Sequence, residues 1–553
     1  MSELAVGDST ELPASWNVAA IDEVASINPK LAEAIDDSDH VHFVPMAAVA
    51  EDFGGIDVSA TRPYGEVRKG YTYFASQDVL FAKITPCMEN GKGALVPELA
   101  HIHAFGSTEF HVLRSYGAVR PKWLACFLSQ PDFRKAARHN MMGTAGQLRV
   151  PTKWLSTSKL PVPPLAEQDR VLEKLEELLS DLDAGVAELK AAQRKLAQYR
   201  QSLLKAAVEG ALTADWRAVR LDNAKPTSSS SPRKRGSSAS VASKSLDSRF
   251  RGNDEQGGSG ADLLQRILTE RRARWEAKQL AKYAEQGKTP PKGWQAKYPE
   301  PDVPDLANQP PLPKGWAWAS VEQLGEVQLG RQRSPDKLKG DNPTPYIRAA
   351  NITEIGVDLT DVLEMDFSPT ERETFALKRG DILLTEASGS AEHVGRPAIW
   401  TQDHGLYCFQ NTVLRFTPNT ISAEFGFFSF LAMQKLGVFS RLSGGVGINH
   451  LSAGKFSKLP IALPPITEQQ AVVDTLRGCL SACDQQNLAI ETSLKQAAAQ
   501  RKNILKAAFA GQLIPQDPND EPASALLERI RAVQVAKAVT GRGKTGQKRK
   551  EKS

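Results

Sequence analysis

The chain of 553 residues contains one long pattern twice. The first copy opens on PPLAEQ at 163–168 and closes on LKAAVEGAL at 204–212. The second opens on PPITEQ at 464–469 and closes on LKAAFAGQL at 505–513. The offset is 301 residues (464 − 163) and needs no gap. Solenoid repeats run about 20–50 residues, so this long period indicates a duplicated module instead.

The duplication extends upstream of this pattern. LPASW at 12–16 returns as LPKGW at 312–316, and KLP at 159–161 returns at 458–460. Each module is therefore a variable region followed by a better-matched helix. Two such modules in one chain suit a target that itself has two parts.

Composition excludes several classes of protein. No apolar stretch approaches the ~20 residues of a membrane span, and the N-terminus lacks the basic and apolar regions of a secretory signal. Five cysteines, an odd number without paired spacing, fit reduced thiols. These features predict a cytoplasmic protein. Basic runs at 233–235 and 542–552 are typical of nucleic-acid contacts or of solvated tails.

Both variable regions mix short strands with helices. The strand-like DVLF at 78–81 is matched by DILL at 381–384, and each is followed by an apolar helical pattern. The predicted fold class is α+β, with two α/β-mixed domains, two long antiparallel coiled-coil helices and a pseudo-twofold internal repeat. The predicted segments are a first variable domain at 1–162, a central helix at 163–215, a low-complexity insert at 216–260, a short helix and linker at 261–311, a second variable domain at 312–462, a distal helix at 463–516, and a C-terminal helix with a basic tail at 517–553.

The two long helices carry heptad stripes. The stripe of the first helix is Leu175, Leu182, Leu189, Leu196 and Leu203, and the corresponding positions of the second are Leu476, Cys483, Ile490, Ala497 and Ile504. Some 45 helical residues make a rod of roughly 65–70 Å. A lone amphipathic rod cannot bury its stripe, so we expect the two rods to pair, most simply antiparallel. The alternative is that each rod docks only on its own domain.

Low complexity marks the segment 227–260, which is rich in Ser, Gly, Arg and Asn. Such a composition cannot build a core. We expect a dispensable, disordered insert.

Catalytic motifs are absent from the sequence. It has no GxxxxGK[ST] phosphate loop, no HExxH or paired CxxC metal pattern and no GxSxG elbow. The Asn/Asp-Pro-Pro-Tyr/Phe tetrapeptide of adenine methylases is also missing. We therefore expect no catalytic residue and no metal site, and a role in recognition and assembly.

Taken in order and in duplicate, these features resemble the specificity subunit (HsdS) of type I restriction–modification systems. The resemblance rests on the paired variable domains, the KLP and PPxxEQ helix openings, the LLxRI segment at 263–267 with RARWE at 272–276, and KGW at 292–294. It covers nearly the whole chain apart from the insert and the last few residues.

The resemblance implies a division of labour. Each variable domain would be a target recognition domain that reads one half of a split DNA site, and the coiled coil would fix the gap between the halves. Two methylase subunits would bind S-adenosylmethionine and methylate adenine, and two restriction subunits would use ATP and Mg for translocation and cleavage. This chain would be non-catalytic and hold no cofactor itself.

Two pairs of loops supply candidates for DNA contact. Glycine-rich loops at 143–149 and 444–450 differ in their polar tips, and the loops at 83–92 and 385–390 follow the shared strand. The candidates are Lys83, Lys92, Gln147, Arg149, Glu386, Ser388, Asn449 and His450. The alternatives are a tight turn that joins each domain to its rod, and solvated surface lysines.

Positions repeated in both helices supply candidates for helix-end or partner contacts, because two equivalent methylase subunits need two equivalent surfaces. They are Glu167, Gln168, Leu175, Leu182, Leu189, Leu196, Arg200, Leu203 and Lys205, with Glu468, Gln469, Leu476, Ile490, Arg501, Ile504 and Lys506 in the second copy. Packing of the two rods against each other would also explain much of the similarity between the two copies.

Three other functions compete with this interpretation. A tandem DNA-binding regulator would act without methylase partners and would not need long matched rods. A structural scaffold would leave the divergent domains without a purpose. A self-sufficient methyltransferase is disfavoured by the missing cofactor motifs.

Overall fold

The computed structural model describes residues 11–101, 103–144, 146–223, 258–333, 340–388, 390, 392–442 and 449–550. It divides into two compact units, one formed by 1–191 with 490–553 and the other by 192–489. Each unit combines one variable domain with parts of both long helices. Most of the predicted insert, residues 224–257, lies outside the described residues.

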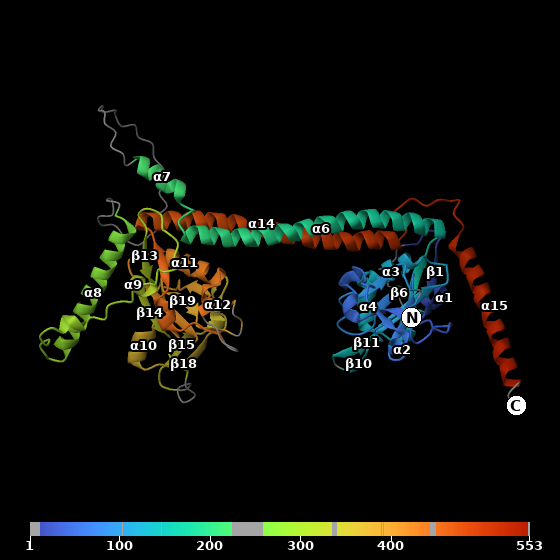
Figure 1. Cartoon of the computed structure of the whole chain (residues 1–553), viewed down its shortest axis with the longest axis horizontal. Coiled ribbons are helices and arrows are strands. Elements are labelled where there is room, and N and C mark those ends of the chain that lie inside the picture. Colours follow the sequence, from blue (N-terminus) through green and yellow to red (C-terminus); the bar gives the residue numbers. More distant parts are fainter. Residues whose placement is uncertain are drawn as a thin grey trace, which may run out of the picture. The chain divides into compact units, whose positions relative to one another are not determined.

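Unit 1 contains the first variable domain, whose strands and helices alternate irregularly (Figure 1). Its elements are β1 (Asn17–Ala20), α1 (Ile21–Val24), β2 (Ala25–Ile27), β3 (His40–Val44), β4 (Thr61–Pro63), α2 (Tyr64–Val67), β5 (Thr72–Ala75), β6 (Val79–Ala82), β7 (Gly93–Leu95), β8 (His103–Gly106), β9 (Phe110–Ser115), α3 (Pro121–Ser129), α4 (Pro131–His139), β10 (Met142–Thr144), β11 (Gln147–Arg149), α5 (Thr152–Thr157) and β12 (Lys159–Val162). The strands form two four-stranded sheets, β2-β9-β6-β7 and β4-β3-β8-β5, and two small antiparallel pairs, β1-β12 and β10-β11.

Unit 2 contains the second variable domain, built on the same plan. Its elements are β13 (Ala317–Ser320), α9 (Val321–Leu324), β14 (Gly325–Leu329), β15 (Pro343–Ile347), β16 (Ile352–Thr353), β17 (Gly356–Val357), β18 (Leu363–Asp366), α10 (Pro369–Phe375), β19 (Ile382–Thr385), β20 (Ala387–Ser388), β21 (Pro397–Ile399), β22 (Cys408–Phe409), β23 (Val413–Pro418), α11 (Ala423–Lys435), α12 (Val438–Leu442), β24 (Asn449–His450), α13 (Ala453–Ser457) and β25 (Pro460–Leu463). The sheet β14-β23-β19-β21 corresponds to β2-β9-β6-β7 of unit 1, and β13-β25 corresponds to β1-β12.

A central strand buried along its whole length anchors each domain. All four residues of β6 and all four of β19 are buried, which explains why both read as short continuous apolar runs. The core of unit 1 continues into the long helices, because Trp123 of α3 packs against Phe509 with ring centroids 4.3 Å apart. The end of the second long helix therefore completes the core of the first domain.

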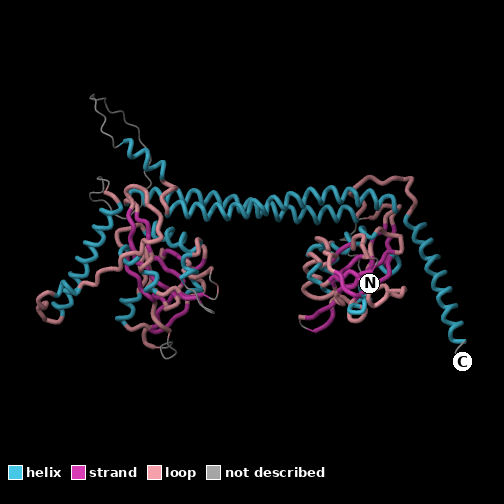
Figure 2. The backbone as a smooth tube through the Cα atoms, in the orientation of Figure 1, coloured by secondary structure: helices cyan, strands magenta, loops and turns pink. Residues whose placement is uncertain are grey.

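The long helices are α6 (Leu165–Val208) and α14 (Ile466–Phe509), and they run side by side (Figure 2). In unit 2 the Gln193 amide lies 3.2 Å from Asn487, and Arg200 pairs with Asp484. In unit 1 Arg501 pairs with Asp183 at 2.5 Å. Residue numbers rise along one helix as they fall along the other, so the predicted antiparallel pairing is confirmed. Docking of each rod on its own domain alone is wrong.

Burial along the heptad stripes is uneven. The outer positions Leu175, Leu203 and Leu476 are buried, whereas Leu189 and Ile490 near the middle are half-buried. The outer positions also belong to the hydrophobic cores of the two domains.

Three further helices follow the rods: α7 (Ala214–Asn223), α8 (Gly260–Glu285) and α15 (Ala523–Lys550). The last two begin in equivalent ways. The Gly260 amide donates to the Gly315 carbonyl at 2.6 Å, and the Ala523 amide donates to the Ser15 carbonyl at 3.0 Å. Side chains of α15 are described only as far as residue 536. None of the helices described here has the length and apolarity needed to cross a membrane.

Candidate DNA and subunit interfaces

Each long helix starts on a buried Glu-Gln pair. The Gln168 Oε1 accepts from the Arg120 amide at 2.7 Å, and the Gln469 Oε1 accepts from the Ser422 amide at 3.1 Å. Arg120 and Ser422 are the N-cap residues of α3 and α11, so the glutamine fastens each long helix to its own domain. Because both glutamines are fully buried, they act at the helix end and offer no surface to another subunit.

The two glutamates have different surroundings. Glu468 accepts from the Thr213 hydroxyl at 2.7 Å and pairs with Arg217 of α7. In the described part of the chain neither carboxylate oxygen of Glu167 has a hydrogen bond. Burial raises the pKa of Glu167, and the nearby side chains of Trp16 and Gln516 lower it by less. One helix start is thus neutralised by an arginine and the other is not.

Two arginines at equivalent positions of the rods each contact the opposite rod. Arg200 of α6 pairs with Asp484 of α14, and Arg501 of α14 pairs with Asp183 of α6. Asp183 and Asp484 are themselves equivalent, so the two pairs are related by the internal repeat. Lys205 lies 3.8 Å from Glu209 on its own helix, and Lys506 is exposed. The two arginines therefore link the two rods to each other. The two lysines give the ends of the helices a polar surface.

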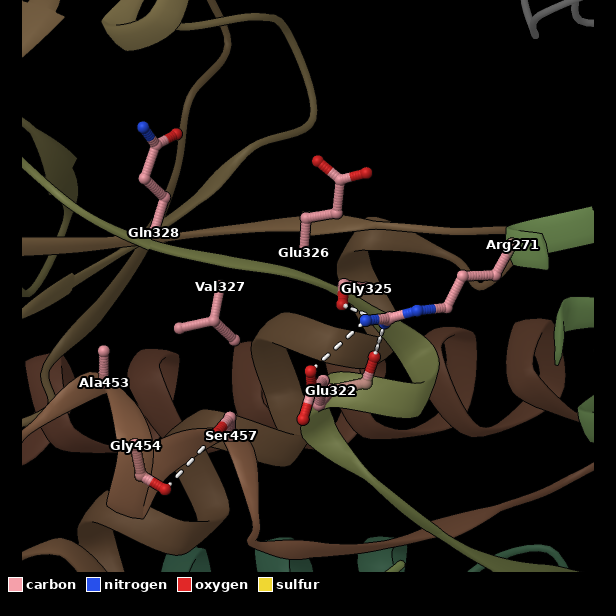
Figure 3. Close-up of a pocket in the computed structure, with 9 residues that line it drawn as sticks. All are labelled: Arg271, Glu322, Gly325, Glu326, Val327, Gln328, Ala453, Gly454 and Ser457. Carbon is pink, nitrogen blue, oxygen red and sulfur yellow. Dashed lines mark hydrogen bonds and ion pairs between the residues drawn. The ribbon is translucent and has the colours of Figure 1, made fainter. Parts of the chain in front are cut away.

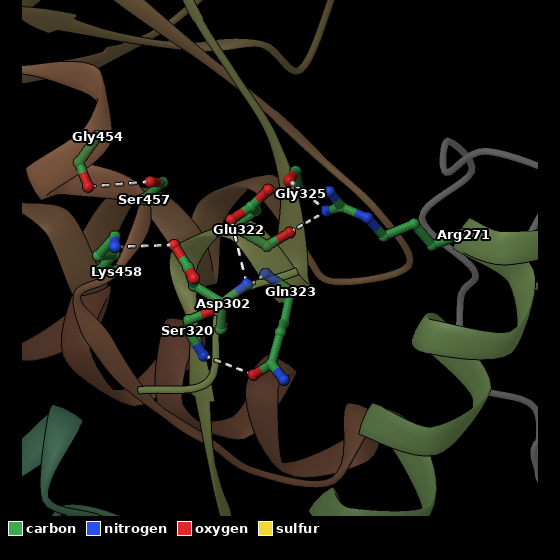
Figure 4. Close-up of polar contacts among 9 residues, drawn as sticks. All are labelled: Arg271, Asp302, Ser320, Glu322, Gln323, Gly325, Gly454, Ser457 and Lys458. Carbon is green, nitrogen blue, oxygen red and sulfur yellow. Dashed lines mark hydrogen bonds and ion pairs between the residues drawn. The ribbon is translucent and has the colours of Figure 1, made fainter. Parts of the chain in front are cut away.

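A shallow pocket lies between α8, β14 and α13 in unit 2 (Figure 3). Arg271 of α8 crosses it to the Glu322 backbone carbonyl and the Glu322 carboxylate, and Lys458 pairs nearby with Asp302 at 3.2 Å (Figure 4). Its lining contains neither histidine nor cysteine. Arg271 therefore fastens α8 to the domain.

Two DNA candidates of domain 1, Gln147 and Arg149, lie on the hairpin β10-β11. Figure 1 places this hairpin at the end of the domain away from α6 and α14. Gln147 is exposed. The guanidinium of Arg149 donates from Nη2 to Glu109 Oε1 at 2.8 Å and from Nε to Glu109 Oε2 at 3.0 Å. Arg149 lowers the pKa of Glu109 by this hydrogen bonding.

The other two candidates of domain 1 are lysines. Lys83 follows β6 directly and is half-buried beside Glu109. The Lys92 ammonium donates to the Met46 carbonyl at 3.2 Å, so it is held by backbone. The structure therefore brings Lys83 and Arg149 together around Glu109 and leaves Lys92 apart.

The candidates of domain 2 meet at the corresponding place. Glu386 lies 3.2 Å from the His450 Nδ1, and β20 pairs Ala387 with His450 and Ser388 with Asn449. The Ser388 hydroxyl accepts from the Ser390 amide at 3.2 Å. The loop 443–448 and the side chain of Asn449 lie outside the described residues.

Comparison with known proteins bears on this duplicated arrangement. Residues 313–498 match the family described as the type I restriction modification DNA specificity domain. The type I restriction enzyme EcoEI specificity subunit of Escherichia coli is 26% identical over 501 residues, covering 86% of this chain and 79% of that protein. The EcoAI specificity subunit of Escherichia coli is 25% identical over 495 residues, covering 87% and 80%.

The fold has a counterpart among solved structures. A chain from a study of complex assembly and conformational transition of the type I R-M system superposes with a TM-score of 0.60 at 17% identity, covering 91% of this chain and 100% of that one. The chain is thus similar to type I specificity subunits over most of its length, and residues 313–498 match their DNA specificity domain. The expected resemblance is confirmed along most of the sequence.

Sequence reasoning missed several pairing residues. Glu109, Asp183, Asp484 and Arg217 were not singled out, although each holds a residue that was. Asp183 and Asp484 could have been found, because they repeat at the same offset as Arg200 and Arg501. Glu109 could not, since it lies 40 residues from Arg149 along the chain.

Proposed function

We propose that this specificity subunit binds a bipartite DNA site, with one half read by each variable domain, and directs adenine methylation and restriction by partner subunits. The observation that carries the proposal is the duplicated unit. Each copy presents an equivalent surface built on equivalent backbone, while the polar side chains on it differ. Such an arrangement suits two different half-sites.

The partners are proposed from the family. Two methylase subunits would supply S-adenosylmethionine chemistry, and two restriction subunits would supply ATP- and Mg-dependent translocation and cleavage. The two repeat-related helices α6 and α14 would offer two equivalent surfaces, one for each methylase. This chain would supply the recognition of the DNA sequence in a cytoplasmic complex, and its partners would supply catalysis.

The regulator that acts without a methylase is not favoured. Long matched rods held by two repeat-related ion pairs serve no purpose in a simple tandem binder. They are expected in a protein that must hold two recognition domains and two partners.

The direct test maps modified adenines across the genome of cells that carry the chain with its methylase subunit, against cells that lack only the chain. We expect a split motif with a fixed gap, present only when the chain is present. Co-purification of the chain with the methylase is the accompanying measurement. A methylase that modifies the same motif without this chain would contradict the proposal.

The proposed spacing role of the rods has its own test. One heptad inserted into both α6 and α14 adds about 10 Å of helix, which corresponds to about three base pairs. The gap in the methylated motif should lengthen accordingly while both half-sites stay the same. An unchanged gap in a methylating variant would show that the rods do not set the spacing.

A further inference from the structure

One backbone crossing occurs in both variable domains with closely matching geometry. In domain 1 the Lys83 amide donates to the Glu109 carbonyl at 2.9 Å, and the Val150 amide donates to the Lys83 carbonyl at 2.8 Å. In domain 2 the Glu386 amide donates to the Thr412 carbonyl, and the Leu451 amide donates to the Glu386 carbonyl, both at 2.8 Å. Lys83 thus corresponds to Glu386.

Two more positions follow from this register. Glu109 corresponds to Thr412. Arg149 corresponds to His450, because Arg149 bridges to Ile84 as His450 pairs with Ala387. We call these sets the reading crossings: Lys83, Glu109 and Arg149 in domain 1, and Glu386, Thr412 and His450 in domain 2.

The chemistry of the two crossings is different although the backbone is the same. Domain 1 has a carboxylate in the middle position between two cations. Domain 2 has the carboxylate at the first position and an imidazole at the third, with a neutral threonine between them. Arg149 is 41% exposed and His450 is 57% exposed, so both reach solvent. At the third position, where both side chains reach solvent, the shared backbone does not require the exchange of arginine for histidine.

The arginine is held in one orientation. Nε and Nη2 donate to Glu109, and Nη1 donates to the Gln147 carbonyl at 3.2 Å. A guanidinium has five N–H groups, so one N–H on each terminal nitrogen is still available. These two form a fork of the kind that donates to O6 and N7 of guanine in the major groove. The hairpin that carries Arg149 is a two-stranded ribbon, which the major groove admits.

We propose that the reading crossings are the base-contacting positions of the two domains, that Arg149 held by Glu109 reads a guanine in one half-site, and that the Glu386–His450 pair reads a different base in the other. This inference rests on the proposed function and names the specificity residues within it. Glu109 acts as a positioning residue, since it orients the guanidinium and does not face the base.

The test uses the full chain with its methylase subunit and the genomic DNA of the host as substrate. Arg149→Lys keeps the charge but loses the fork. We expect one position of one half-site to lose its guanine preference by about 10- to 100-fold while the other half-site is unchanged. Glu386→Gln should change only the other half-site.

Matched controls exist in both domains. Arg68 of domain 1 is 46% exposed and pairs with Asp37 at 2.9 Å, so Arg68→Lys makes the same change away from the crossing. Glu354 of domain 2 pairs with Lys435 at 3.3 Å, so Glu354→Gln is the matched change there. Both controls should leave the motif unaltered.

Several outcomes would overturn the inference. One is an Arg149→Lys variant that methylates the unchanged motif at a uniformly lower level, as a phosphate contact would. If Arg149→Lys abolishes methylation, the test of the inference rests on Glu386→Gln. An unchanged motif in the Glu386→Gln variant then rejects the inference. Failure of the proposed function is distinguishable, because the unaltered chain would then direct no split motif at all.

Discussion

Two buried acids occur in both copies of the repeat, and in each case one copy gives the acid a closer arginine than the other. At the helix start, Glu468 pairs with Arg217, whereas neither carboxylate oxygen of Glu167 has a hydrogen bond within the residues that the structure describes. At the head of the central strand the pattern is reversed. Asp78 accepts two hydrogen bonds of 2.7 Å from Arg114, whereas Asp381 has the Thr417 hydroxyl at 2.7 Å and Arg415 only at 4.0 Å.

The surroundings of each acid determine how it ionises. Burial raises the pKa of Glu167 and of Asp381, the two acids without a close arginine. The sequence places equivalent acids at both sites, and the difference comes from distant residues. At the position equivalent to Arg217 unit 1 has Pro518, and at that of Thr213 it has Ile514. Duplication has therefore preserved the acids and not their partners.

The largest expected effect comes from removing the arginine at the paired helix start. Arg217→Ala leaves Glu468, which is 2% exposed, without its cation. Breaking a buried ion pair in this way costs about 3–5 kcal/mol. Denaturant unfolding of the whole chain should show the loss in unit 2.

The double variant with Glu468→Gln provides the control for this prediction. It should recover most of the stability, because the stranded charge is removed as well. A single variant as stable as the unaltered chain would show that Arg217 does not neutralise Glu468.

Glu167→Gln should act in the opposite direction. The pKa of Glu167 is raised above its ordinary value of 4.5, so as pH rises through that value the unfolded chain releases its proton first and stability falls. The loss is complete once the pH exceeds the raised pKa. Glutamine removes the charge, and we expect unit 1 to gain on the order of 1 kcal/mol at neutral pH.

The measurement is thermal unfolding of both proteins across a pH series. Their difference should shrink as pH falls toward 4.5, because the native glutamate is protonated there. A difference that stays constant with pH would mean that the carboxylate charge is not the cause.

Domain 1 has a buried titratable group whose equivalent position in domain 2 holds an apolar residue. His111 is buried, its Nε2 lies 2.8 Å from the Val150 carbonyl, and the equivalent residue of domain 2 is Leu414. Burial lowers the pKa of His111 below its ordinary value of 6.5. As pH falls through 6.5 the unfolded chain binds a proton first, so domain 1 loses stability and domain 2 does not.

His111→Leu checks this difference. It should remove the acid sensitivity of domain 1 at a cost of about 1 kcal/mol at neutral pH for the lost hydrogen bond. Hydrogen exchange resolved by peptide separates the two domains. Equal acid sensitivity of the two domains in the unaltered chain would contradict the assignment to His111.

The sequence predicts a structural feature when the residues that determine it are neighbours along the chain. The helix openings, the heptad stripes and the central strands β6 and β19 depend on neighbouring residues, and they were predicted. The surroundings of Glu167 and Glu468 were not, because Arg217 belongs to α7, a helix that the sequence did not indicate. The Arg149–Glu109 pair joins residues that only the folded sheet brings together. Candidate residues were thus found without the partners that orient them.

The smallest effect concerns an ion pair whose charges are exchanged between the copies. Lys122 of α3 pairs with Glu176 of α6 at 2.6 Å, whereas Glu424 of α11 pairs with Arg477 of α14 at 2.5 Å. The positions are equivalent and the charges are reversed, so each domain matches its own helix and would repel the other. Exposed pairs contribute about 0–1 kcal/mol each, so the pair adds little to stability.

Its contribution to specificity of assembly is testable with a domain exchange. A chain in which the two variable domains trade places would put Lys122 beside Arg477 and Glu424 beside Glu176. Restoring the pairs with Lys122→Glu and Glu424→Lys in the exchanged chain should recover about 1 kcal/mol at low salt and less at high salt, because surface charges are screened. Equal stability of the exchanged chain with and without the restored charges would show that the reversal does not assign each domain to its helix.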